Sequence, residues 1–232
     1  MEALVEVKNL AKRFGRRWAL EEVNLTVPRG VICGVLGVNG AGKSTLLRIL
    51  AGVQRPTRGE IRIMGSRPGR ITKAHLAFVP EIDHLYPWMD VQEAMDFTAS
   101  FYQDFNRERA AELQSLMQLE PSACISTLSR GFRARLKLLL AMSRDAALIL
   151  LDEPLSGIDP ISCRKIIAAI IQAYRPAHST ILIATHLIGE IEPVLDRVVF
   201  LHRGRVVLDE EAEVVRAARG RSVEDLFREV LA

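Results

Sequence analysis

The 232-residue sequence has few of the features that mark secreted, zinc-binding or membrane-spanning proteins. Its three cysteines, Cys33, Cys124 and Cys163, are widely spaced and odd in number, which argues against a disulfide framework and a zinc site. No apolar stretch reaches the roughly 20 residues that a membrane-spanning helix needs. The alternating start MEALVEVKNL has no apolar run of the kind found in signal peptides. These absences favour a reducing cytoplasm; any membrane spans would belong to another chain.

The sequence also lacks a strong charge of either sign. The formal net charge is only +3 and the arginines are spread along the chain, so we expect no nucleic-acid partner. The length suits one large or two small domains with a real core. Because there is no internal repeat and no Pro/Ser-rich linker, we predict one domain over residues 1–232.

Two kinds of strand are predicted in the first half of the chain. Residues 3–30 alternate apolar and polar residues, as half-buried antiparallel strands do. VICGVLG (31–37) is apolar on both faces, as a central parallel strand is. A helix is expected from near Lys43 to Gly52, and short strands in GEIRIMG and HLAFVP.

The second half alternates helices with buried strands. Residues 91–143 give only helical patterns, whereas AALILL (146–151) and TILIAT (180–185) are apolar runs on either side of a helical segment. A hairpin is expected to turn at Arg203–Gly204, with two short helices after it broken at Gly220. These patterns predict an α/β fold. Its divisions are a core (1–80 and 144–209) that includes an N-terminal antiparallel β subdomain, an inserted helical subdomain (81–143) and C-terminal helices (210–232).

The segment GVNGAGKS fits the phosphate-binding pattern G-x-x-x-x-G-K-[ST]. Glycines let successive backbone N–H groups turn toward a polyphosphate at the start of a helix. The alternative is a simple glycine-rich turn, but the buried strand before it and the helix after it favour a nucleotide site in a P-loop NTPase core with a mainly parallel sheet. Lys43 would reach the β- and γ-phosphates and Ser44 would bind Mg²⁺. The expected nucleotide-binding residues here are Asn39, Gly40, Ala41, Gly42, Lys43, Ser44 and Thr45.

Acidic residues end the next buried strand, in LILLDEP. A carboxylate such as Asp152, directly after an apolar run, is tolerated there only beside a cation or a donor network. Mg²⁺ held through water is the natural partner. Glu153 would polarise a water molecule in line with the γ-phosphate. A solvated strand end is the alternative, and the nearby phosphate loop disfavours it.

The stretch LSRGF, residues 128–132, has no catalytic side chain. Ser129 is a good N-cap and FRARLKLLLAM continues with helical spacing, so by itself this segment is an ordinary helix start.

The order GVNGAGKST, LSRGF, LILLDEP, SGID, ATH resembles the ATPase subunits of ATP-binding cassette (ABC) transporters over essentially the whole chain. This resemblance implies that Phe14 stacks on adenine; the alternative is a core aromatic. It implies that Asp159 lies in a loop that crosses between two subunits and that His186 contacts the γ-phosphate. LSRGF would be the signature segment, usually LSGGQ, whose Ser129 and Gly131 bind the ATP held by the other subunit.

Two departures from the family pattern stand out. Arg130 and Phe132 replace a glycine and the glutamine of the signature, and Arg130 would either add charge near phosphate or point outward. Glu81 stands where the family usually has a glutamine that ligates Mg²⁺ and relays the nucleotide state. The implied metal ligands are therefore Ser44, Asp152 and Glu81.

The resemblance implies a catalytic set of Lys43, Glu153 and His186, acting with ATP and Mg²⁺. The chain would be a peripheral subunit on the inner face of the cell membrane, forming a homodimer or heterodimer and powering a membrane-spanning permease chain. LYPWMD (85–90) is either a contact surface for that chain or part of the core. The alternative function is a soluble ABC-type ATPase acting on a cytoplasmic assembly. A nucleotide sensor without turnover is disfavoured because Glu153 and His186 are both present.

Overall fold

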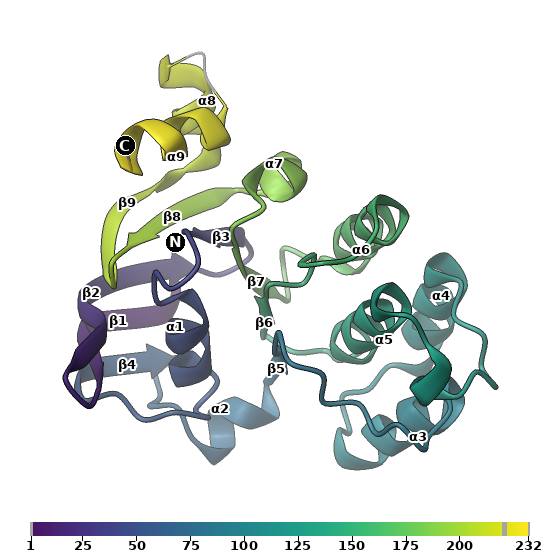
Figure 1. Cartoon of the computed structure of the whole chain (residues 1–232). Helices are drawn as coiled ribbons and strands as arrows, with labels where there is room; N and C mark the ends of the chain where they lie inside the picture. The colour runs from purple at the N-terminus through teal and green to yellow at the C-terminus, as the bar shows by residue number, and fades with distance from the viewer. Residues whose placement is uncertain (1, 220–221, 232) are drawn as a thin grey trace.

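Two β-sheets and a lateral group of helices make up the chain (Figure 1). The computed structural model describes residues 2–219 and 222–231. The first sheet is antiparallel, with strand order β2-β1-β4. Its strands are β1 (Ala3–Phe14), β2 (Arg17–Pro28) and β4 (Arg58–Ile63). The predicted strands over residues 3–30 and in GEIRIMG are thereby confirmed.

The second sheet has the strand order β5-β6-β7-β3-β8-β9, and all its neighbours are parallel except the β8–β9 pair. Every residue of β3, β6 and β7 is buried, as expected from their continuous apolar runs. Since parallel strands point the same way, β3, β6 and β7 end at one edge of the sheet. The six strands are β3 (Ile32–Leu36), β5 (Leu76–Val79), β6 (Leu148–Asp152), β7 (Thr180–Thr185), β8 (Arg197–His202) and β9 (Arg205–Glu211).

Separate apolar cores cover the two faces of this sheet. On one face, α1 (Lys43–Leu50) and the first sheet enclose residues such as Leu46, Val35 and Val199. On the other, α5 (Arg130–Met142) and α6 (Pro160–Ala173) pack over residues such as Ile149 and Ile183. The phosphate loop joins the end of β3 to the start of α1, at the sheet edge where β6 and β7 also end.

The residues between β5 and β6 are helical, as the sequence pattern predicts. They form α3 (Val91–Phe101), α4 (Arg107–Met117), the short 3₁₀ helix η1 (Ile125–Thr127) and α5. Figure 1 shows this teal group beside the central sheet, away from the first sheet. Three short elements were not predicted: α2 (Arg70–Ala74), α7 (Ile188–Ile191) and the 3₁₀ helix η2 (Glu192–Val194). Each is too short to show a helical period.

The C-terminal part also follows the prediction. The β8–β9 hairpin turns at Arg203 and Gly204, whose φ angles are 47° and 78°. Two helices follow, α8 (Ala212–Arg219) and α9 (Val223–Leu231); the predicted break at Gly220 lies outside the described residues. Within the described ranges, no helix has both the length and the apolar character needed to cross a membrane.

Candidate nucleotide site

The phosphate loop has a backbone path that only glycine fits at its critical points. Gly40 and Gly42 have φ angles of 82° and 111°. A Cβ atom on Gly42 would lie 2.5 Å from the carbonyl oxygen of Ala19, and one on Gly37 would lie 2.5 Å from that of Leu201. The helix α1 that follows has no side-chain cap. Its first N–H groups are therefore free to bind an anion.

Lys43 is buried beneath this loop, with 4% of its surface exposed. Its Nζ donates to the carbonyls of Gly37 and Val38, at 2.8 and 3.3 Å, and lies 3.0 Å from Oε1 of Glu153. Without nucleotide, the lysine charge is thus compensated by groups of the same chain. A phosphate would compete with these partners for the ammonium group.

Ser44 and Asp152 form the centre of the predicted metal site. The Ser44 hydroxyl donates to Oδ1 of Asp152 at 2.8 Å, while Oδ2 is buried and has no hydrogen-bond partner among the described residues. Burial raises the pKa of Asp152; Ser44 and Arg48 lower it, but burial prevails. A buried carboxylate oxygen without a donor, next to a hydroxyl, fits Mg²⁺. Glu81 lines the same cavity as Ser44.

Glu153 is nearly buried and is held at both carboxylate oxygens. Its Oε2 accepts from the hydroxyl of Thr185 at 3.0 Å and lies 3.0 Å from Nδ1 of His186. Burial raises the pKa of Glu153, but Lys43, His186 and Thr185 together lower it by more, so the net shift is downward. The carboxylate is therefore charged and oriented, as a group that positions a water molecule must be.

Thr185 is a site residue that the sequence analysis missed. Besides donating to Glu153, its hydroxyl accepts from the backbone N–H of Leu187 at 3.0 Å. This side chain thus links the end of β7 to the carboxylate at the end of β6. The sequence does show a hydroxyl residue directly before His186, but it does not show that this hydroxyl bonds to Glu153.

A cavity of about 550 Å³ is lined by Lys43, Ser44 and Glu153, whereas Asp152 lines a neighbouring cavity. Phe14 lies on its wall with 52% of its surface exposed, so it is not a core residue and its ring is available to a base. Ala41 is the one predicted loop residue from 39 to 45 that does not line the cavity, because its side chain is buried. The lining residues are Phe14, Arg17, Ala19, Asn39, Gly40, Gly42, Lys43, Ser44, Thr45, Glu81, Glu153, Ser156 and His186.

The signature residues are not part of this cavity. Ser129 is exposed at the start of α5, where its hydroxyl accepts from the Phe132 N–H at 3.4 Å. A Cβ on Gly131 would lie 2.5 Å from Oγ of Ser162 and 2.8 Å from Oδ2 of Asp159. Asp159 caps α6, accepting from the backbone N–H of Ser162 at 2.8 Å and from its hydroxyl at 2.6 Å. Within one chain, these residues do not meet the phosphate loop.

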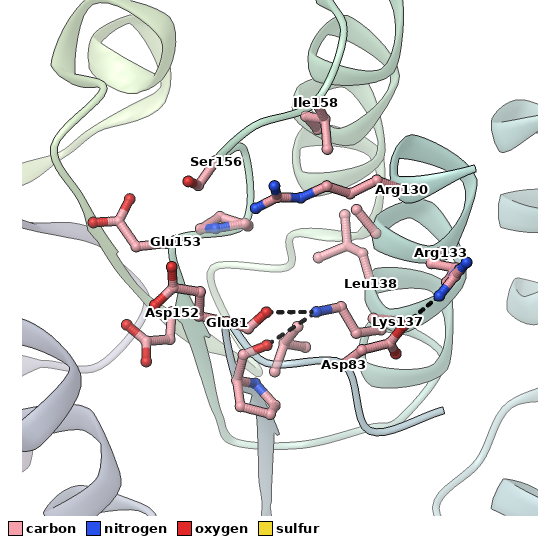
Figure 2. A pocket seen from close by; sticks show the side chains of 14 residues that line it. Glu81, Asp83, Arg130, Arg133, Lys137, Leu138, Asp152, Glu153, Ser156 and Ile158 are labelled. Carbon is pink, nitrogen blue, oxygen red and sulfur yellow. Dashed lines mark hydrogen bonds and ion pairs between the residues drawn. The ribbon is translucent and has the colours of Figure 1, made fainter. Parts of the chain in front are cut away.

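Arg130 does not point away from the molecule. A Cβ on Gly157 would lie 2.6 Å from its Nη1, so the guanidinium covers the loop that follows Glu153. Figure 2 shows Arg130 extending toward Ser156 along one wall of a second cavity, of about 350 Å³. Glu81, Glu153 and Ser156 line both cavities. The arginine therefore lies close to the nucleotide cavity without lining it.

Basic residues of α5 hold the segment that contains Glu81 (Figure 2). Nζ of Lys137 donates to three successive carbonyls, those of Pro80, Glu81 and Ile82, at 3.1, 3.2 and 3.4 Å. One helical turn earlier, Arg133 forms an ion pair of 3.2 Å with Asp83. The Glu81 backbone is thus bound to the signature helix.

The aromatic residues of LYPWMD are at the surface rather than in the core. Trp88 and Tyr86 have 71% and 42% of their surface exposed. The Tyr86 ring centroid lies 5.0 Å from that of Trp88 and 5.3 Å from that of Phe97. Together they form an exposed aromatic group over α3, next to the Glu81 segment.

Comparisons with known proteins agree with this geometry. A family model described as ABC transporter matches residues 20–156. Nod factor export ATP-binding protein I of Rhizobium meliloti (strain 1021) is 32% identical over 214 residues; these are 88% of this chain but 63% of that protein. A solved ATP binding subunit of an ABC transporter has a TM-score of 0.87 at 29% identity, covering 99% of this chain and 100% of that chain.

A second solved structure is a dimer. It is an ATP-binding cassette in a post-hydrolysis state bound to ADP and Pi, with a TM-score of 0.79 at 25% identity, covering 90% of this chain and 98% of that chain. The chain belongs to the ABC transporter family, as an ATP-binding cassette that hydrolyses ATP.

Proposed function

We propose that this chain is the ATPase subunit of an ABC exporter and closes head to tail on a second ATPase subunit, either a copy of itself or a related chain. One observation carries the proposal: the phosphate loop and Glu153 are preorganised within the chain, whereas Ser129 is exposed and outside their cavity. ATP bound by one subunit would meet the N-terminus of α5 of the other.

The residues of the chain then have distinct tasks. Lys43 and the loop N–H groups bind the β- and γ-phosphates, and Glu153 orients the attacking water. His186 holds the Glu153 carboxylate and is placed to contact the γ-phosphate. Ser44, Asp152 and Glu81 would hold Mg²⁺, which neutralises phosphate charge when bound. Ser129 and Gly131 act on the nucleotide of the partner subunit, with Asp159 bracing Gly131.

The helical subdomain, residues 81–143, is proposed to contact a membrane-spanning permease chain at the inner face of the membrane. Two features support this assignment: the exposed aromatic group with Tyr86 and Trp88, and the Lys137 hydrogen bonds that tie the Glu81 segment to the signature helix. Export is supported by the relative named for Nod factor export. The rival role on a cytoplasmic assembly predicts co-purification with water-soluble partners. The transport role predicts recovery with a multi-span chain from detergent-solubilised membranes.

The reaction and the dimer are tested together with Glu153→Gln. This variant should bind ATP, hydrolyse it at least about 100-fold more slowly, and accumulate as an ATP-dependent dimer in light scattering, since the charge that orients water is removed. Glu112→Gln, an exposed glutamate on α4, is the matched control and should behave as wild type. Hydrolysis by Glu153→Gln at the wild-type rate would refute the role of Glu153.

A further inference from the structure

Arg17 faces the nucleotide cavity because of the register of the first hairpin. Arg17 begins β2 and lies directly opposite Phe14, the last residue of β1. Directly opposite residues of an antiparallel pair project to the same face of the sheet. The adjacent pair, Arg13 and Trp18, projects to the other face, where the guanidinium carbon of Arg13 lies 5.4 Å from the Trp18 ring centroid. Phe14 and Arg17 accordingly line the cavity together.

The Arg17 guanidinium lies close to the phosphate loop. A Cβ on Gly40 would lie 3.8 Å from its Nη2. The backbone of Arg17 pairs with β1, but its guanidinium forms no hydrogen bond or ion pair with any residue in the described ranges, 2–219 and 222–231. Lys43, in contrast, already binds two carbonyls and Glu153. Arg17 is thus a cationic side chain of the cavity wall without an anionic partner among the described residues.

The cavity wall carries carboxylates as well as cations, so a phosphate bound there needs positively charged partners. Glu81 and Glu153 both line it, and Lys43 already has an ion pair with Glu153. A guanidinium forms two parallel hydrogen bonds to phosphate oxygens, and its charge is permanent.

We propose that Arg17 binds the phosphates beyond the α-phosphate of the nucleotide in the same subunit, beside Gly40 of the phosphate loop. Its contribution increases with the number of phosphates beyond the α-phosphate. This inference rests on the proposed nucleotide site and adds to it a residue that none of the sequence motifs contains.

The test compares Arg17→Gln with Arg16→Gln by titration calorimetry against AMP, ADP and ATP at fixed ionic strength. Both variants lose one positive charge, but Arg16 lies in the hairpin turn and does not line the cavity. We expect Arg17→Gln to weaken ADP and ATP binding about 10-fold or more, the range for a charge-assisted hydrogen bond. AMP binding should change less than about 2-fold, and Arg16→Gln should be near wild type. Arg17→Lys should recover part of the loss.

Three results would overturn the inference. Equal weakening by Arg16→Gln and Arg17→Gln would mean that only the long-range field matters. An equal loss of affinity for AMP and ATP would mean that the substitution disturbs base binding or the folding of the loop. Unchanged ATP affinity in Arg17→Gln would show that Arg17 does not contact the phosphates. A wild-type chain that binds none of the nucleotides would instead refute the nucleotide site itself.

Discussion

The two helix starts that the proposed head-to-tail dimer would bring together are built differently in this chain. At α1, the cap is a glycine with no side chain, and buried Lys43 and Glu153 surround the loop. At α5, Ser129 caps the helix, and the segment is exposed. One start is open at its N–H groups and enclosed by charged side chains, while the other is already capped and faces solvent. In the proposed dimer, this difference means that one chain binds the nucleotide and a second chain completes the reaction centre.

The largest effects should separate these two regions. Lys43→Ala removes the buried ammonium under the loop and should weaken ATP binding about 10- to 100-fold and abolish hydrolysis. Ser129→Arg should also abolish hydrolysis but leave the ATP affinity of the monomer within about 2-fold of wild type, because Ser129 does not line the cavity. Calorimetry and a phosphate-release assay measure the two quantities.

Ser126→Arg, at an exposed serine of η1, is the control for the added charge and bulk. A loss of monomer ATP affinity in Ser129→Arg that matches the loss in Lys43→Ala would mean that the signature works within its own chain, and the comparison would fail.

The next effect concerns how Glu153 is held. Thr185→Val keeps the shape of the side chain but removes the hydroxyl that donates to Oε2. We expect kcat to fall about 10-fold with little change in KM, and Thr185→Ser to recover most of it, because one positioning hydrogen bond is worth roughly 1–1.5 kcal/mol. Steady-state kinetics of the three proteins would measure this. An equal loss in Thr185→Ser, or a rise in KM alone, would contradict the positioning role.

The smallest effect tests why Gly131 is a glycine. Its Cα packs against Ser162 and Asp159 of the same chain, so Gly131→Ala should lower the free energy of unfolding by about 1 kcal/mol without any nucleotide. Chemical denaturation of the wild type and the variant would measure the difference. Unchanged stability together with lost hydrolysis would mean that this glycine serves only the partner's ATP.

The sequence predicted those parts of the site that are local in the chain. The phosphate loop, Asp152 with Glu153, and His186 each follow a buried strand, and parallel strands bring such ends to one edge. Thr185 and Arg17 were missed because their importance depends on partners across the fold: Thr185 on Glu153, and Arg17 on the register of β1 with β2.

For other residues, the sequence left alternatives that only packing decides. Phe14 was either a base-stacking or a core aromatic, and its exposed position in the cavity wall decides against the core. Arg130 was expected either to lie near the phosphates or to point outward, and its close contact with Gly157 shows that it does not point outward. The three carbonyls bound by Lys137 belong to a segment more than 50 positions earlier, so no local sequence pattern predicts these hydrogen bonds.

A mixing experiment tests the central claim most directly. Lys43→Ala and Ser129→Arg are each expected to be inactive alone, but a mixed head-to-tail dimer contains one site with an intact phosphate loop and an intact signature. If the chain pairs with its own copy, mixing the two purified variants should restore about a quarter of the wild-type hydrolysis rate per subunit when pairing is random and each intact site acts independently. The same mixture remaining as inactive as its components, although mixed dimers are demonstrated by tagged pull-down with ATP, would contradict the account.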